Sequence, residues 1–259
     1  MTDLRATITN DDGIDSPGLA ALARCAADGG LDVLIVAPAA ESSGTSAGVT
    51  ATGDHRRIAT ERRTLPAAPS VPAYAVAAHP GLIAFAVANG AFGPKPDLLL
   101  SGINRGANVG RAVLHSGTVG AALTASINGV RALAVSLAVS LHVSPHAELD
   151  GRWDGAAELA VRAAKMLAEL PPGTVLNLNV PDVAPARLRP LRRARLATFG
   201  TVQGRVQQLD DGSLEIVAVQ VDDEPEPGTD AALLAAGYPT ITVLRSVDED
   251  TELVLPDLG

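Results

Sequence analysis

Two adjacent carboxylates stand near the beginning of the chain. Asp11 and Asp12 follow the apolar residues 6–9, which predict a strand, and Ser16-Pro17-Gly18 next predicts a helix start. Adjacent carboxylates repel each other unless a positive charge neutralises them, and their oxygens suit Mg²⁺ or Mn²⁺ better than zinc. The pair therefore indicates a divalent-cation site, although Asn, Asp and Gly also favour an ordinary turn there.

Two further loops carry oxygen ligands directly after predicted strands. Ser42 and Ser43 follow the second predicted strand, and Asn104 and Asn108 follow the fourth. Parallel strands end at one edge of a sheet, where α/β proteins bind their ligands. A hydroxyl and an amide from these loops can therefore converge with the two carboxylates on one cation, because all of these groups are oxygen ligands.

A fourth element suits an anion. Ser116, Gly117 and Thr118 lead into an apolar helix, and the free N–H groups at a helix N-terminus attract phosphate. A plain helix cap is the alternative interpretation of this serine and threonine. His115 adjoins the turn and is a candidate to stabilise or protonate a leaving group. Replacing Gly117 with valine is expected to weaken phosphate binding and leave metal binding nearly unchanged.

Alternating strand and helix patterns predict the elements that position these residues. The fold class is α/β, with a mainly parallel sheet flanked by helices. The predicted strands cover residues 6–9, 32–37, 73–77, 97–101, 132–137 and 175–180. The predicted helices begin at Ser16, at Pro80 and at Ser116, and a fourth covers residues 155–170.

The pattern changes after Pro181, where Arg-rich and then acidic segments follow. We therefore predict an α/β core over residues 1–182 and a β-rich extension over residues 183–259 that serves oligomerisation. The extension is expected to hold a hairpin over residues 203–219, a helix over 230–236 and a strand over 240–244.

Composition limits the partners. A net charge of −9 disfavours a nucleic-acid polymer, because binding to phosphate backbones needs clustered Lys and Arg. The single cysteine, Cys25, excludes an internal disulfide, and the chain shows neither a targeting segment nor the ~18 consecutive apolar residues of a membrane span. We expect a cytoplasmic protein that does not bind membranes.

These segments together resemble the SurE family of stationary-phase survival proteins over nearly the whole chain. The matching motifs are Ile8-Thr9-Asn10-Asp11-Asp12-Gly13-Ile14, Val36-Ala37-Pro38 with Ser43-Gly44, Ser101-Gly102-Ile103-Asn104-Arg105-Gly106 with Asn108, His115-Ser116-Gly117-Thr118-Val119 and Leu176-Asn177-Leu178-Asn179-Val180-Pro181. The resemblance implies a Rossmann-like domain, a homodimer or homotetramer, and a divalent-metal-dependent phosphatase. Its expected substrates are 5′ or 3′ nucleoside monophosphates and, in some members, short polyphosphate.

The resemblance also implies roles for individual residues. One divalent metal, most simply Mg or Mn, falls on Asp11, Asp12, Ser43 and Asn104. The substrate phosphate falls on Asn108, Ser116, Gly117 and Thr118. The catalytic residues are then Asp11, which orients or deprotonates the attacking water, together with Asn108 and His115.

Four positions depart from the family pattern: Ala39, Ser42, His79 and Thr124. Because the surroundings of a metal site tune its ligands, the alternative is a nucleotide- or metal-binding relative with weakened catalysis. An aspartyl-phosphate phosphatase is less consistent, since that chemistry commonly uses two Asp separated by one residue. A dinucleotide oxidoreductase is disfavoured because no Gly-x-Gly-x-x-Gly follows the first strand.

Overall fold

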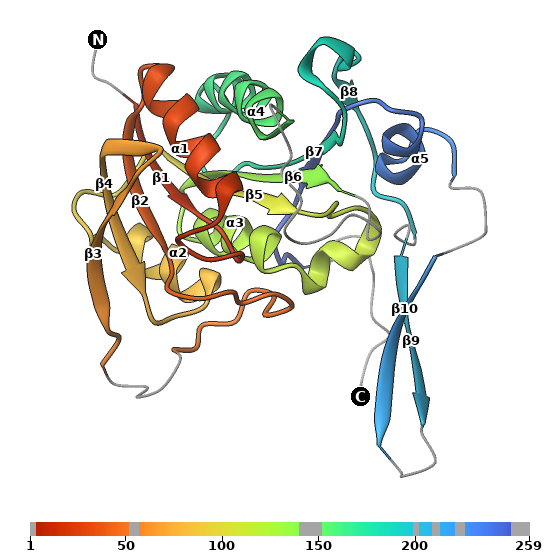
Figure 1. Cartoon of the computed structure of the whole chain (residues 1–259), viewed down its shortest axis with the longest axis horizontal. Coiled ribbons are helices and arrows are strands. Elements are labelled where there is room, and N and C mark those ends of the chain that lie inside the picture. Colours follow the sequence, from red (N-terminus) through yellow and green to blue (C-terminus); the bar gives the residue numbers. More distant parts are fainter. Residues whose placement is uncertain are drawn as a thin grey trace, which may run out of the picture.

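A computed structural model describes residues 4–51, 57–139, 152–198, 202–208, 213–220 and 226–249. Within them, a nine-stranded sheet has the order β3-β4-β2-β1-β5-β6-β7-β11-β8 (Figure 1). Its strands are β1 (Arg5–Thr9), β2 (Asp32–Pro38), β3 (Thr60–Leu65), β4 (Ala68–Val76), β5 (Leu98–Arg105), β6 (Arg131–Ala138), β7 (Val175–Pro181), β8 (Arg192–Arg193) and β11 (Thr240–Leu244).

The helices are α1 (Pro17–Asp28), α2 (Pro80–Ala88), α3 (Gly117–Ile127), α4 (Arg152–Ala168) and α5 (Asp230–Ala235), with 3₁₀ turns η1 (Gly110–His115) and η2 (Pro185–Arg187). Helices α1 and α4 cover one face of this sheet, and α2 and α3 cover the other (Figure 1). The predicted α/β class with a mainly parallel sheet is confirmed, and all of the predicted strands and helices are present within a few residues of their expected limits.

The direction of the central strands decides where the site forms. β1 pairs in parallel with β2 and with β5, and β5 continues in parallel through β6 to β7. The loops that follow β1, β2 and β5 therefore leave one edge of the sheet together. This geometry is the one on which the sequence-based site depends.

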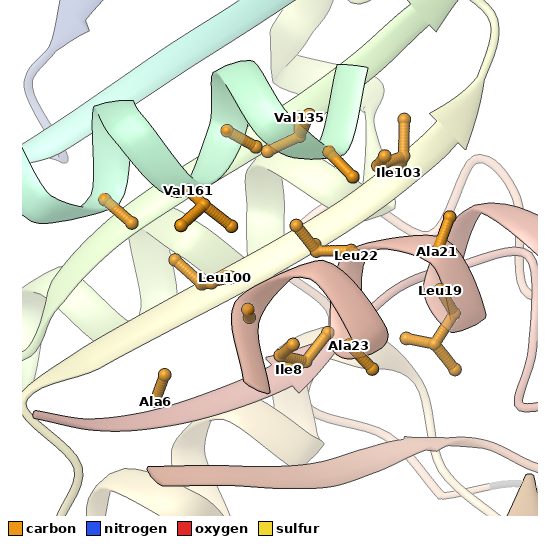
Figure 2. Close-up of a cluster of buried hydrophobic side chains, with 14 of the residues drawn as sticks. Ala6, Ile8, Leu19, Ala21, Leu22, Ala23, Leu100, Ile103, Val135 and Val161 are labelled. Carbon is orange, nitrogen blue, oxygen red and sulfur yellow. The ribbon is translucent and has the colours of Figure 1, made fainter. Parts of the chain in front are cut away.

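The core lies on both sides of the strands, because successive side chains of a strand point to opposite faces. Leu98 and Leu100 face α1 and α4, whereas Leu99 faces α2 and α3. Figure 2 shows side chains of α1 and α4, among them Leu22 and Val161, packed over β1, β5 and β6. The strands are buried on both faces, which explains their continuous apolar sequence.

The segment after residue 182 is integrated into the same sheet. β11 pairs antiparallel with β7, and β8 pairs in parallel with β11. The fully buried carboxylate of Asp230, the first residue of α5, accepts hydrogen bonds from Gly110 N at 2.9 Å and Ala197 N at 2.9 Å. The C-terminal segment thus contacts the loop that leads into η1.

The predicted hairpin forms a separate antiparallel pair, β9 (Val202–Gln208) with β10 (Leu214–Gln220), which lies apart from the main sheet in Figure 1. Its predicted turn at residues 210–212 lies outside the described residues. β3 is a strand that the sequence analysis missed, because its residues are polar and it lies at an exposed edge. No helix in the described ranges is long and apolar enough to span a bilayer.

Candidate active site

A cleft of about 920 Å³ opens at the carboxyl edge of the sheet. Its walls come from the loops after β1, β2 and β5 and from the starts of α1, α3 and α4. The predicted site residues that line it are Asp11, Asp12, Ser43, Asn104, Asn108, His115 and Ser116. Residues from four separate parts of the sequence therefore meet in one cleft, whereas the predicted Gly117 and Thr118 are buried behind its wall.

Asp11 is the most tightly held of these side chains. It is only 4% exposed, and Thr118 donates to it twice: the hydroxyl to Oδ1, and the backbone N–H to Oδ2 at 3.1 Å. The backbone oxygen of Asp11 accepts a bond from Ser42 N at 2.7 Å. Burial raises the pKa of Asp11, while the bonds from Thr118 oppose that rise.

Asp12 carries the second carboxylate of the cleft. Burial and then the charge of Asp11 raise its pKa to about 7, although the backbone N–H of Arg105 donates to Oδ2 at 3.3 Å. One buried and one half-buried carboxylate with raised pKa values form a centre of negative charge that its neighbours do not fully balance. Such a centre favours a bound cation.

The remaining donors decide whether a cation fits. Among the described residues, no three His, Cys, Asp or Glu side chains cluster as metal ligands. A metal at Asp11 and Asp12 must therefore be completed by neutral oxygens, and the cleft offers Ser43 and Asn104. An all-oxygen set with two carboxylates is the chemistry of Mg²⁺ or Mn²⁺ and not of a structural zinc. The donor set fits the predicted metal.

The two neutral donors differ in how firmly they are placed. Asn104 donates its side-chain nitrogen to Gly106 O at 2.8 Å, which orients the amide oxygen as the atom for a cation. Ser43 is exposed, and its hydroxyl donates to Glu41 Oε1 at 2.9 Å. This bond uses the proton of the hydroxyl, so the lone pairs of the Ser43 oxygen remain available to a cation.

Asn108 is fixed by three buried polar side chains. Its N–H donates to Asn179 Oδ1 at 2.8 Å, and its own amide donates to Ser136 Oγ at 2.9 Å. Its carbonyl oxygen accepts from Asn177 at 2.8 Å and from Asn179 at 2.9 Å. Strands β6 and β7 thus set the position of a loop that belongs to β5. We call Asn177, Asn179 and Ser136 the asparagine clamp.

The residues in the turn at the start of α3 have different roles. Ser116 lines the cleft and caps the helix, with its Oγ accepting from Val119 N at 3.1 Å. Thr118 is fully buried and gives both of its donors to Asp11. In this structure Thr118 therefore positions the carboxylate, and Ser116 and His115 are the residues of the turn that reach the cleft.

Gly117 packs directly against Asp11. A Cβ atom at this position would lie 2.9 Å from Asp11 Oδ2 and 3.0 Å from Asp11 Cβ. The expectation that a valine at Gly117 would leave metal binding unchanged is therefore wrong, because the larger side chain would displace a carboxylate of the metal site. Glycine is required here by close approach.

Several cleft residues were missed by the sequence analysis. Trp153 and Arg105 line the cleft, and the asparagine clamp lies behind it. Two signals pointed to them: Trp153 is the single tryptophan of the chain, and Asn177 and Asn179 interrupt an otherwise apolar buried strand.

The departures from the family pattern have different surroundings. Ala39 lines the cleft, so the change there alters its wall. Ser42 lies in the same loop and gives its N–H to Asp11 O. Thr124 is buried in α3 and donates to Gly120 O at 2.8 Å, and His79 precedes α2 as its N-cap residue without a side-chain cap bond.

Comparison with known families decides the relationship. The family model of survival protein SurE matches residues 6–202, a range that includes all of the described residues that line the cleft. The chain belongs to the SurE family. The resemblance on which the sequence analysis relied is confirmed.

Individual relatives agree with this assignment. The protein named 5′-nucleotidase SurE from Chloroflexus aggregans is 38% identical over 247 residues, covering 92% of this chain and 91% of its own. The protein of the same name from Moorella thermoacetica is 36% identical, covering 92% and 88%. The crystal structure of the SurE protein from Aquifex aeolicus superposes with a TM-score of 0.73 at 26% identity and covers 93% of both chains. The Rossmann-like fold of the SurE proteins is therefore also the fold of this chain.

Proposed function

We propose that this protein is a divalent-metal-dependent phosphomonoesterase that hydrolyses nucleoside monophosphates to nucleoside and phosphate. The observation that carries the proposal is the meeting of two adjacent carboxylates of raised pKa, buried Asp11 and half-buried Asp12, with the α3 N-terminus in one cleft. The names of the SurE relatives, 5′-nucleotidase, support the choice of substrate.

The cation would be held by the two carboxylates together with Ser43 and Asn104. When bound there, it supplies positive charge to the phosphoryl oxygens and makes a bound water more acidic. The protein residues then have separate tasks. The side-chain amide of Asn108 and the Ser116 end of α3 hold phosphoryl oxygens, and the helix dipole favours their negative charge.

Asp11 serves the attacking water. Thr118 occupies one acceptor position on each of its oxygens, so the carboxylate is fixed in orientation and keeps further lone pairs for the proton of the water. As the water oxygen bonds to phosphorus, the ester P–O bond breaks, and the leaving oxygen needs a proton. His115, exposed at the cleft, is the group that we propose donates it.

The test is hydrolysis of AMP and of p-nitrophenyl phosphate, with phosphate release measured in EDTA and after addition of Mg²⁺ or Mn²⁺. We expect turnover only with metal, and none for Asp11→Asn. Metal-independent turnover would overturn the metal requirement. Because Ala39 alters the wall of the cleft, the second candidate is a protein that binds metal and nucleotide without turnover. Calorimetric binding of AMP with Mg²⁺ in the absence of phosphate release would favour that candidate.

A further inference from the structure

Among the described residues that line the cleft, Trp153 is the aromatic one, and the proposed reaction assigns it no role. It is the second residue of α4, and it lines the cleft together with Pro17, Gly18 and Val139. The turn at the start of α3, where Ser116 is proposed to hold the phosphate, lies on the opposite face of the sheet from α4. The cleft therefore runs around the edge of the sheet, from the polar start of α3 to an apolar wall at the start of α4.

The indole ring is held firmly in this wall. A Cβ atom at position 18 would lie 2.9 Å from Trp153 Cζ3, so the ring packs against a backbone that carries no side chain. Both sequence neighbours of Trp153 are anchored. Arg152 Nη1 contacts both carboxylate oxygens of Asp182 at 3.0 and 3.1 Å, and Asp154 pairs with Arg24 at 2.5 Å. The start of α4 is thus fixed to the end of β7 and to α1.

The ring contacts of the described residues do not include Trp153. They are the pair Tyr74–Phe92 and the two arginines over Tyr238. The indole N–H also makes no hydrogen bond within these residues, although a buried tryptophan usually has such a partner. An anchored, half-buried ring at the wall of a cleft, without an aromatic or cationic partner, is suited to stack against a flat ligand.

The size of the cleft indicates what that ligand is. A volume of about 920 Å³ lies near the upper end of the range for small-molecule sites and far exceeds the need of a phosphate ion. We propose that Trp153 is the platform on which the base of the nucleoside monophosphate stacks, while its phosphate lies at Asp11 and Ser116. This inference rests on the proposed function for its substrate class. Stacking tolerates any base, because every base has a π-face.

The first test uses the fluorescence of the single tryptophan. Wild-type protein is titrated with adenosine, AMP and ribose 5-phosphate in Mg²⁺, with N-acetyltryptophanamide as the reference for absorption by the adenine. We expect saturable quenching by adenosine and AMP and none by ribose 5-phosphate. Absence of quenching by adenosine and AMP overturns the stacking proposal. Because adenosine is not hydrolysed, this result is independent of turnover.

The second test separates binding from chemistry. Trp153→Ala is expected to raise KM for AMP about 10-fold, with kcat and the KM for glycerol 2-phosphate unchanged, and Trp153→Phe should restore most of the AMP affinity. Phe85→Ala is the matched control, since Phe85 is an exposed aromatic outside the cleft. An unchanged KM for AMP in a folded Trp153→Ala variant overturns the platform and leaves the phosphatase proposal standing. Quenching by adenosine without any phosphatase activity supports the stacking role of Trp153 and overturns the proposed phosphomonoesterase activity.

Discussion

Two loops supply the neutral donors of the cleft, and they are held in opposite ways. The segment that ends β5 and leads into η1, residues 104–110 (called here the β5 loop), is half-buried or buried, and the asparagine clamp and Asp230 bond to it from distant parts of the chain. The loop after β2, residues 39–50, is mostly exposed. Its two ends are bonded to distant residues, Ala39 N to Val76 O and His79 N to Thr50 O, and between them Ser42 N donates to Asp11 O and Ser46 Oγ to Leu114 O. Its other bonds within the described residues are local, such as Thr45 Oγ1 to Ser42 O at 2.9 Å.

The difference indicates a division of labour. Bonds from strands β6 and β7 and from helix α5 order the β5 loop in advance, so Asn104 and Asn108 need little reorganisation when a ligand arrives. Around Ser43, residues 39–44 of the β2 loop are mostly exposed, and exposed segments of this kind open at low free-energy cost. We infer that the β5 loop sets the geometry of the reaction and that the β2 loop adjusts around the cation.

Asp11 accepts a bond from Ser42 N of the β2 loop, and its neighbour Asp12 accepts one from Arg105 N of the β5 loop, so the loss of Asp11 should have the largest effect. Asp11→Asn removes an anionic ligand and the group that receives a proton from water. We expect kcat for AMP to fall by about 10³-fold or more, within the range for general acid–base groups. Phosphate release with saturating Mn²⁺ measures this, and circular dichroism checks the fold. Activity within a few-fold of wild type would remove Asp11 from the mechanism.

A change in the asparagine clamp should have the second-largest effect, and it tests whether the ordered β5 loop sets the catalytic geometry. Asn179→Ala leaves the part-buried N–H of Asn108 without its acceptor, which costs about 1 kcal/mol of unfolding free energy. Because Asn108 then loses its fixed position, we expect kcat to fall about 10- to 100-fold, as for residues that orient metal or substrate ligands. Urea unfolding and AMP turnover provide the two readouts.

Asn89→Ala is the matched control for the clamp, since Asn89 caps an exposed helix end by donating to Phe85 O at 2.8 Å. It should leave turnover unchanged. If Asn179→Ala lowers stability without affecting kcat, the β5 loop does not depend on the clamp for its catalytic geometry.

A change in the β2 loop should have a smaller effect on metal binding. Ser43→Ala removes one neutral donor from an exposed loop, so we expect the Kd for Mn²⁺ to rise by less than about 10-fold, below the usual effect of changes around a metal site. Titration calorimetry without substrate measures it. Ser42→Ala is the control, because its hydroxyl donates to Ala40 O at 3.3 Å. A larger rise for Ser42→Ala would assign the ligand to the other serine.

The smallest expected effect is on the stability of the metal-free protein. Burial and Asp11 raise the pKa of Asp12 to about 7 from 3.8, so the folded state binds a proton that the unfolded state has released. Stability is therefore highest at low pH in this window and falls as pH rises from about 4 to about 7. We expect Tm in EDTA to decrease over this range, and to decrease less in Asp12→Asn. Asp28→Asn, at the exposed end of α1, should behave as wild type.

The sequence predicted the parts of this protein that depend on local patterns. Apolar runs of strand length fix β1, β2, β5, β6 and β7, because strands buried on both faces need continuous apolar residues. The same patterns located Asp11, Asp12, Asn104 and Asn108, since residues that follow parallel strands must emerge at one edge. The polar edge strand β3 was not predicted, because its residues are mostly exposed and need not be apolar.

Tertiary structure alone decided which groups contact one another. Thr118 lies 107 residues from Asp11, and Asn179 lies 71 residues from Asn108, so no local pattern shows that either pair is bonded. Trp153 meets Gly18 only because α4 packs beside α1. Local sequence sets the type and position of a residue, whereas its partner depends on how distant elements pack. For that reason the residues at the strand ends were predicted, and the residues that hold them in place were found only in the fold.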